Sequence, residues 1–263
     1  MIRAILFDLG DTLLNFEPMD TNAVVRQGCG EAYKQLQLAG CKLPSEARFR
    51  RMNVWSVRRA LLWSKIRGRE FNAMQVMRKH AVRYGAPDED AFMLDVGWHW
   101  YQPVVPYSSI EPDLISTLQL FRSRGIKLGI VSNTFITGAI LDRHLELMGL
   151  IEHLPVRIYS SEIGFRKPHP LIFNAALSAI GARPQETLFV GDVIKNDILG
   201  AGRLGMKTAL KRTATNHHNH CPANYCIHRI ADLIPIVLPN CEAAASVTVR
   251  STDPVRPSPA LRG

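Results

Sequence analysis

The sequence predicts an α/β protein in which an all-helical domain is inserted into a doubly wound parallel sheet. Three observations support this fold class. A short apolar run over 2–7 stops at an aspartate, the segment 16–105 has helical periodicity, and helical and strand patterns alternate from about 111 onward. Alternating units of this kind build a parallel sheet with helices on both faces. We therefore expect a core domain over 1–15 and 106–239 and a helical domain over 16–105.

The individual elements follow from the same patterns. After the strand over 2–7, the inserted block shows apolar helical spacing over 21–39, 45–65, 70–84 and 88–100. The core then continues with helices over 112–124, 137–148, 170–180 and 197–204. Between them we expect strands over 126–131, 156–159, 187–190, 207–210 and 225–228. The tail over 240–263 is rich in Ala, Ser, Pro and Arg and lacks periodicity, so we expect it to be disordered.

The composition is that of an ordinary globular protein, with 46% hydrophobic and 21% charged residues in a chain of 263. The longest apolar runs, over 126–132 and 231–238, are shorter than the roughly 18 residues that a membrane span requires. Asp8 and Asp11 interrupt the N-terminal stretch where a secretory signal would need an apolar region. We therefore expect a cytoplasmic protein without a membrane partner, and nothing in the sequence indicates an oligomeric state.

The cysteines and a histidine-rich run are expected to carry no chemistry. The five cysteines are odd in number and contain no CxxC pair, which predicts mostly buried, reduced thiols; they are Cys29, Cys41, Cys221, Cys226 and Cys241. The run NHHNHC over 216–221 matches no standard zinc spacing. Because Cys226 falls in the last expected strand, we interpret this run as a surface loop.

Polar residues follow several of the expected strands at the point where each strand ends. Ligands of open parallel sheets bind at the carboxyl ends of the strands, so these side chains should converge on one crevice. A single acid at a strand end is usually a turn or helix cap. Polar residues at the ends of four strands, by contrast, favour a functional site. The residues are Asp8, Ser132, Asn133, Lys167, Asp192 and Asp197.

Together, the segments FDLGDT, VSNT, RKP and VGDVIKND resemble the four motifs of the haloacid dehalogenase superfamily. The resemblance covers roughly residues 1–238 and makes the helical block a cap that closes over the site. It implies magnesium-dependent hydrolysis of a small phosphorylated metabolite. The nucleophile would be Asp8, which would form an aspartyl phosphate that water then cleaves.

The resemblance also assigns the remaining roles. Asp8, Asp192 and the backbone carbonyl of Gly10 would be ligands of Mg²⁺, a cation that prefers oxygen. Asp197 would bind metal waters or orient Lys167. Lys167 would hold the Asp8 carboxylate and the phosphate, because phosphoryl transfer needs charge neutralisation. Ser132 and the backbone amide of Asn133 would donate hydrogen bonds to phosphoryl oxygens.

The first motif departs from the family pattern DxDGT, because Gly10 and Asp11 are exchanged. In phosphatases of the family the second aspartate protonates the leaving group and activates water. Glycine can do neither. General acid and base catalysis, which contributes roughly 10² to 10⁴ in rate, is therefore in question. Asp11 either turns its carboxylate inward and takes the role of that second aspartate, or it caps the following turn.

Three other functions stay open as alternatives because of Gly10. The first is a catalytically weak, regulatory protein that binds metal and phosphate. Dehalogenase members, which cleave C–halogen bonds, carry an aromatic residue at this position and differ in the fourth motif. Phosphonate-cleaving members carry alanine there and need a cap lysine. The cap lysines of this chain are Lys34, Lys42, Lys65 and Lys79.

The excess of positive charge, formally +9, is concentrated in the cap. Between Arg48 and Arg69 there are eight basic residues and no acid. Arg51, Arg58 and Lys65 are spaced by seven and therefore lie on one stripe of the expected helix. They are either solvated or bind an anionic leaving group. A second stripe with Met52, Trp55, Leu62 and Ile66 is expected to pack inside. Nucleic-acid binding is disfavoured, because aromatic residues do not alternate with the basic ones.

Overall fold

A computed structural model describes residues 1–67, 69–213, 216 and 221–239, so the expected disorder of the tail lies outside the described residues. Its core is a six-stranded parallel sheet in the order β5-β4-β1-β6-β7-β8. The strands are β1 (Ala4–Phe7), β4 (Lys127–Ser132), β5 (Val156–Tyr159), β6 (Thr187–Gly191), β7 (Lys207–Lys211) and β8 (Tyr225–Ile227). This confirms the predicted fold class.

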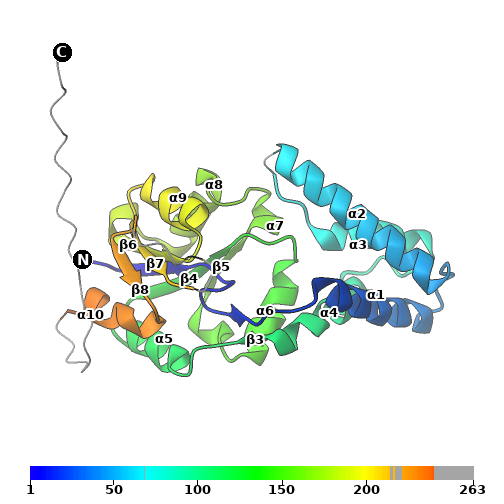
Figure 1. The fold of residues 1–263 in the computed structure, drawn as a ribbon, viewed down its shortest axis with the longest axis horizontal. Coiled ribbons are helices and arrows are strands. Elements are labelled where there is room, and N and C mark those ends of the chain that lie inside the picture. Colours follow the sequence, from blue (N-terminus) through cyan, green and yellow to red (C-terminus); the bar gives the residue numbers. More distant parts are fainter. Residues whose placement is uncertain (68, 214–215, 217–220, 240–263) are drawn as a thin grey trace, which may run out of the picture.

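Alternation along β1 explains why helices cover both faces of the sheet. Ile5 and Phe7 belong to a buried cluster with residues of α5 (Leu114–Ser123) and α6 (Gly138–Leu147). Leu6 points the other way, into a cluster with α8 (Pro170–Ile180). The two layers of helices lie on opposite sides of the strands in Figure 1. Every residue of β1 is fully buried, as a central parallel strand requires.

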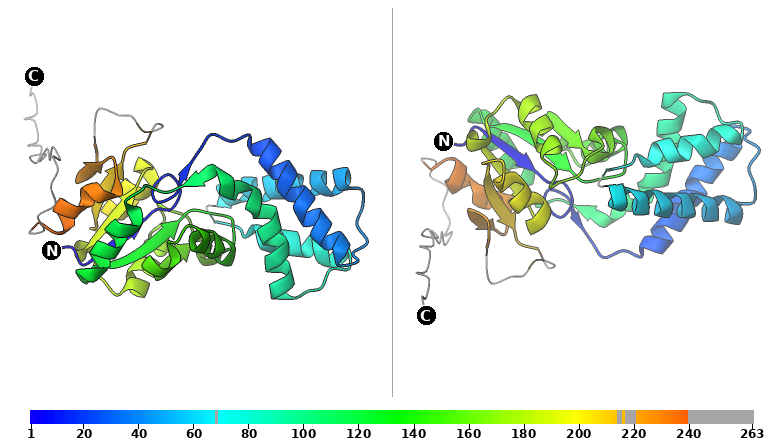
Figure 2. Two further views of the ribbon diagram at one scale, coloured as in Figure 1. Left: turned by 90° about the horizontal axis from the view of Figure 1, so that it is seen from below. Right: turned by 90° about the horizontal axis from the view of Figure 1, so that it is seen from above.

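The helices of the inserted block form a separate group beside the core, as the views in Figure 2 show. They are α1 (Thr21–Leu38), α2 (Glu46–Arg67), α3 (Ala73–Arg83) and α4 (Asp90–Tyr101). At Gly28, α1 approaches α4 so closely that a Cβ atom would lie 2.2 Å from the carbonyl oxygen of Trp100. Among the described helices none has the length and apolarity to cross a bilayer. We propose that this group is a cap domain with the expected bounds of 16–105.

The chain passes between cap and core through two short strands that the sequence did not reveal. They are β2 (Asn15–Phe16) and β3 (Ser108–Ser109), which pair antiparallel. The buried Lys211 of β7 anchors this crossing, because its ammonium lies 2.7 Å from a carboxylate oxygen of Glu111 and donates to the carbonyl of Thr12. The base of the cap is therefore tied to the core sheet.

The prediction of five reduced thiols was wrong for two of them. Cys221 and Cys226 form a disulfide, and the side chain of Cys226 is exposed instead of inside the core. The turn that precedes β8 brings their Cα atoms to 6.4 Å, within the range that a disulfide spans. Cys29 is buried and Cys41 half-buried, both as free thiols. The histidines of the expected surface loop, over 217–220, lie outside the described residues.

The expectation that the apolar stripe of α2 packs inside was wrong for three of its four residues; Met52 is half-buried and accepts from the Tyr84 hydroxyl. Trp55, Leu62 and Ile66 are 60%, 58% and 67% exposed, because α2 turns a side with the small residues Ser56 and Ser64 inward. The guanidinium of Arg59 lies 4.8 Å from the ring centre of Trp55, and the same arrangement recurs at the end of the helix. Aromatic and basic side chains therefore do alternate on this helix, contrary to the premise drawn from the sequence.

Candidate active site

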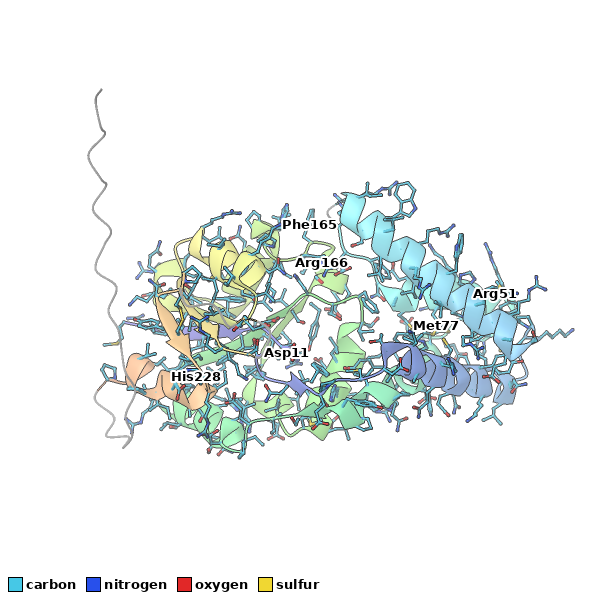
Figure 3. All side chains as sticks on the ribbon, viewed as in Figure 1. Asp11, Arg51, Met77, Phe165, Arg166 and His228 are labelled. Carbon is cyan, nitrogen blue, oxygen red and sulfur yellow. A yellow bond between two sulfur atoms is a disulfide. The ribbon has the colours of Figure 1, made fainter. Side chains whose placement is uncertain are left out.

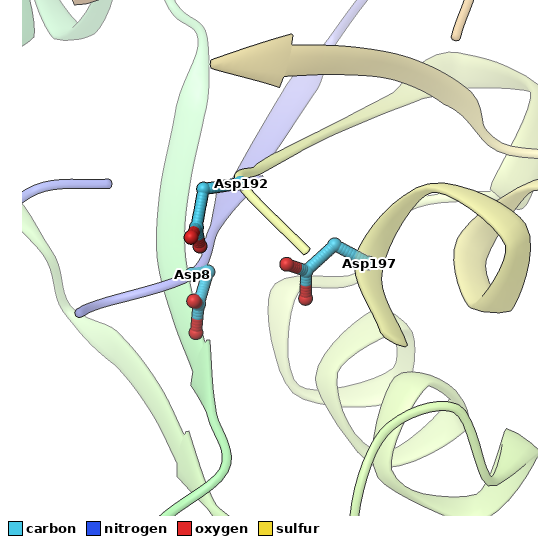
Figure 4. A group of neighbouring side chains, drawn as sticks. All are labelled: Asp8, Asp192 and Asp197. Carbon is cyan, nitrogen blue, oxygen red and sulfur yellow. The ribbon is translucent and has the colours of Figure 1, made fainter. Parts of the chain in front are cut away.

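Three carboxylates gather at the carboxyl ends of the central strands. Asp8 follows β1 and Asp192 follows β6. Because Phe7 and Val190 are register partners, the two acids emerge at the same end of the sheet, offset by one residue. Asp197 approaches them from the side, as Figure 4 shows. One oxygen from each of the three lies within 4.8 Å of the others. The convergence expected at this edge of the sheet is thus present.

Asp197 reaches this position through an unusual start of the following helix. A helix was expected from 197, but the chain forms a π-helical turn over Ile194–Ile198 before the short α9 (Leu199–Gly202). One carboxylate oxygen of Asp197 accepts a hydrogen bond from the Val193 amide at 2.9 Å. A Cβ atom at Gly191 would lie 2.5 Å from the Asp197 carboxyl carbon, so this close approach requires glycine there.

Lys167 joins two of these acids. Its side chain is almost fully buried, with Nζ 2.6 Å from an oxygen of Asp8 and 2.8 Å from one of Asp197. Burial alone would lower the pKa of Lys167, but the negative charges of Asp197 and Asp8 outweigh it and raise that pKa above its usual value. The ammonium is therefore charged and balances part of the acidic cluster.

The Asn133 side chain fixes the loop that carries Lys167. Its amide donates to the carbonyl of Lys167 at 3.0 Å, and its oxygen accepts from the Lys167 backbone N–H at 2.7 Å. Only the backbone of Asn133 was expected to act, so this positioning contact is an addition to the sequence analysis. Ser132, at the end of β4, is buried and lines the same cavity as Lys167.

Asp192 carries a buried carboxylate oxygen, Oδ1, that no described group satisfies. Burial, with the neighbouring charges of Asp8 and Asp197, raises the pKa of Asp192 to about 7. The buried Asn216 holds its backbone, because the Asn216 amide donates to the Asp192 carbonyl at 2.9 Å. Asn216 was missed, since it lies in the stretch that we interpreted as a surface loop.

These residues fit Mg²⁺. The set consists of hard carboxylate oxygens, it carries more negative than positive charge, and it includes one oxygen without a partner. A divalent cation would meet each of these conditions.

The turn after β1 carries the exchanged residues. Asp11 has a φ of +54°, in the left-handed region that aspartate tolerates better than most residues. Its Oδ1 accepts a hydrogen bond from the Phe16 amide at 3.3 Å, so the carboxylate does cap this turn. Asp11 also lines the cavity, as does Gly10. The position of Asp11 is therefore compatible with both alternatives, a cap of this turn and a catalytic acid at the cavity.

The cavity has a volume of about 350 Å³ and lies between the strand ends and the cap. It brings together Asp8, Gly10, Asp11, Ser132, Asn133, Lys167, Asp192 and Asp197. Arg51 and Arg58 are not among its described lining residues; both are exposed on α2, and Figure 3 places Arg51 far from Asp11. Their part in substrate binding stays a prediction that the geometry does not favour.

A contact between cap and core lies next to this cavity and was also missed. The segment between α2 and α3 bonds to core loops: the amide of Glu70 donates to the Gly164 carbonyl at 3.0 Å, and that of Ala73 to the Phe135 carbonyl at 2.8 Å. The buried Glu70 carboxylate lies 3.2 Å from the guanidinium of Arg166, the residue before Lys167. We call residues 69–73 the clasp; the labels of Phe165 and Arg166 mark its partners in Figure 3.

A buried histidine links the cap to the core below the cavity. Ser108 Oγ donates to the Val105 carbonyl, so it accepts from His144 Nε2 at 2.8 Å. His144 Nδ1 then accepts from the hydroxyl of Tyr101 at 2.9 Å. Burial lowers the pKa of His144 to about 4, so the ring is neutral at pH 7.

Comparison with known proteins gives concordant results. The model of the haloacid dehalogenase-like hydrolase family matches residues 2–205. A glyceraldehyde 3-phosphate phosphatase of Methanopyrus kandleri is 29% identical over 212 residues, which are 79% of this chain and 83% of that protein. The pyrophosphatase PpaX of Oceanobacillus iheyensis is 27% identical over 248 residues, 90% of this chain and 97% of that protein.

Among solved structures, a 2-haloacid dehalogenase of Pseudomonas syringae superposes with a TM-score of 0.60. Its sequence identity is 22%, and the match covers 91% of this chain and 99% of that one. At this identity the likeness bears on the fold alone.

Proposed function

The chain belongs to the haloacid dehalogenase-like hydrolases, and we propose that within this family it is a magnesium-dependent phosphatase of small phosphomonoesters. The observation that carries the proposal is the group of Asp8, Asp192, Asp197 and Lys167 at one end of the sheet. The names of the curated relatives, which include phosphatases of small phosphorylated compounds, support the same reaction class.

Asp8 is the nucleophile in this proposal. One of its oxygens is held by Lys167, which leaves the other to attack phosphorus and form the aspartyl phosphate. The Lys167 ammonium then also faces the phosphoryl oxygens, where negative charge is greatest. Ser132 and the Asn133 amide line the same cavity and would donate hydrogen bonds to those oxygens.

Asp8, Asp192 and the carbonyl of Gly10 would hold Mg²⁺, with Asp197 positioning Lys167 or metal-bound water. When bound, the cation would neutralise charge on the phosphoryl group. A free oxygen of Asp192 makes this chain ready for such a ligand.

Asp11 is the general acid and base in this proposal. It is the one lining carboxylate of the described cavity that neither pairs with Lys167 nor belongs to the metal group. Its hydrogen bond to Phe16 fixes the turn while the residue remains at the cavity wall.

Other reactions of the family have less support. Gly10 stands where dehalogenases carry an aromatic residue. Among the cap lysines that a phosphonate-cleaving enzyme would use, Lys34, Lys42 and Lys79 are not among the described lining residues; the side chain of Lys65 is not described. A cytoplasmic location stays a prediction, because the disulfide removes the support that reduced cysteines gave it.

Phosphate release from p-nitrophenyl phosphate in the presence of Mg²⁺ tests the proposal. We expect turnover that chelation abolishes and that Asp8→Asn abolishes too. A matched control is Asp95→Asn, an exposed acid of the cap, which should leave turnover unchanged. Mass spectrometry of a quenched reaction should find the phosphoryl group on Asp8.

Two outcomes would contradict the proposal in different ways. Undiminished turnover in Asp8→Asn would remove Asp8 as nucleophile. Intact Mg²⁺ binding without phosphate release from any of a broad panel of phosphate esters would favour the regulatory, metal- and phosphate-binding alternative that Gly10 raises.

A further inference from the structure

The active-site cavity has two chemically different parts. All of its described charged residues belong to the strand-end group and the turn beside it: Asp8, Asp11, Lys167, Asp192 and Asp197. A phosphoryl group attacked by Asp8 has to lie against this polar part. The ester group would extend along the uncharged lining residues. Four of these have polar side chains (Ser132, Asn133, Thr134 and Asn196), and most of the others are apolar: Leu9, Leu14, Phe16, Tyr101, Val104, Ile136, Leu141 and Val193.

No described cation is available to a second anion in this cavity. Lys167 is the one basic residue among its described lining residues, and both Asp8 and Asp197 already pair with it. Its neighbour Arg166 does not line the cavity and pairs with the buried Glu70. A carboxylate or second phosphate on the leaving group would therefore lose water without gaining a partner.

Two further polar groups of the lining, on Tyr101 and Asp11, are already hydrogen-bonded within the protein. Tyr101 donates its hydroxyl to His144, so what it adds to the cavity is the apolar ring. One carboxylate oxygen of Asp11 accepts a hydrogen bond from the Phe16 amide, and the negative charge of Asp11 would repel an anion beside it. The wall is thus built to cover a body without charge.

We propose that the substrates are phosphate esters of small uncharged alcohols with an apolar body, and that esters with an anionic leaving group are excluded. This inference rests on the proposed phosphatase function and names its substrate class. Phe16, Val104 and Ile136 are the specificity-determining residues, because they line the cavity together. They come from β2, from the 3₁₀ turn Gln102–Tyr107 and from the loop after β4.

A set of five esters, with ethyl phosphate as the reference compound, tests this on the wild-type protein. Carboxymethyl phosphate and carbamoylmethyl phosphate have nearly the same shape and differ in one negative charge. 2-Aminoethyl phosphate adds a positive charge, and n-propyl phosphate replaces polar atoms with carbon. We expect kcat/KM to be roughly 100-fold lower for carboxymethyl than for carbamoylmethyl phosphate. n-Propyl phosphate should exceed ethyl phosphate by roughly fourfold, the gain from one buried methylene.

A designed cation should change this preference. Val104 is half-buried at the cavity, so Val104→Lys should raise the carboxymethyl-to-carbamoylmethyl ratio of kcat/KM at least about tenfold. Val82→Lys adds the same charge on an exposed position of α3 and should leave the ratio as in the wild type.

The outcomes separate this inference from the function on which it rests. Absence of Mg²⁺-dependent turnover on all esters would overturn the phosphatase function and this inference with it. Turnover in which carboxymethyl or aminoethyl phosphate equals or exceeds its uncharged counterparts would overturn the inference alone. An unchanged ratio in a folded Val104→Lys would remove Val104 from the ester-binding wall.

Discussion

Asp11 combines two constraints that usually fall on different residues. Its backbone takes a left-handed conformation, and its carboxylate both accepts from Phe16 and lines the cavity. Asparagine would preserve the backbone preference and the accepting oxygen while removing the ionisable group. This substitution therefore distinguishes a role of Asp11 as a turn cap from a role as a catalytic acid.

We expect Asp11→Asn to lower kcat on an aryl phosphate by roughly 100-fold while the thermal midpoint stays within a degree or two of wild type. Steady-state kinetics and a thermal scan of the same preparation measure both effects. Wild-type kcat in this variant would show that Asp11 is a turn residue only. Asp88→Asn, on the cap surface, serves as a comparison.

His144 gives the protein a pH dependence of stability. The pKa of His144 is about 4 when folded and about 6.5 in an unfolded chain, so the unfolded state takes up a proton first as pH falls. The stabilisation is complete above pH 6.5 and decreases toward pH 4. Between pH 7.5 and pH 5 this group should cost roughly 2 kcal/mol of unfolding free energy.

His144→Leu should be less stable than wild type by about 1–3 kcal/mol at pH 7.5, because the hydroxyls of Tyr101 and Ser108 lose a partner. That difference in unfolding free energy should narrow at pH 5, because the wild type loses stability when His144 of its unfolded state gains a proton. The leucine variant has no such proton to gain. Urea denaturation at both pH values measures it. A difference that is equal at both pH values would mean that folding does not lower the pKa of His144.

Among the elements, the clasp joins the cap to the loop of Lys167. The Glu70 carboxylate accepts from Ser160 Oγ at 3.0 Å and lies beside Arg166, with its side chain fully buried. Phe71 stacks on Phe135 with ring centres 5.5 Å apart, which adds apolar contact to the same junction. The position of Lys167 thus depends on a segment of the cap.

Replacing Glu70 by glutamine should loosen this junction. We expect Glu70→Gln to lower the free energy of unfolding by about 1–3 kcal/mol and to reduce kcat more than it raises KM, because Lys167 loses its fixed position. Glu89→Gln is the control, since Glu89 is exposed and its side chain does not cap α4. Equal effects of the two substitutions in urea denaturation would show that the clasp adds no stability.

At the scale of the whole molecule, a bound cation should stabilise the fold. A ligand that binds only the folded state at 100 times its dissociation constant adds about 2.7 kcal/mol to the unfolding free energy. We expect Mg²⁺ to raise the thermal midpoint of the wild type and to have little effect on Asp192→Asn. Differential scanning calorimetry with and without Mg²⁺ checks this. A shift of equal size in the variant would place the binding site elsewhere.

The sequence predicts the parts of this protein that local patterns encode. The apolar runs ending in Asp8 and Asp192 predict both the strands and their polar ends, because side chains at the carboxyl ends of parallel strands have to meet. The bounds of β5 and α8 agree with the expectation to the residue.

Features that depend on distant partners escaped the sequence analysis. Glu70 and Arg166, the β2–β3 pair and the Asn133 contacts join segments far apart in the chain, and no periodicity records such pairs. The Cys221–Cys226 bond was missed because five-residue spacing matches no familiar motif. The burial predicted for the apolar stripe on α2 failed for another reason. The spacing of apolar residues does not show whether a neighbouring element covers them.

The central place of β1 has a consequence for how the chain is made. This strand leaves the ribosome before both of its neighbours, because β4 and β6 begin only at Lys127 and Thr187. At roughly 5–20 residues per second, the second neighbour follows after roughly 10–40 s. For that time a nascent polypeptide carries a fully apolar segment with both edges unpaired, so we expect its biosynthesis to benefit from a chaperone near the exit tunnel.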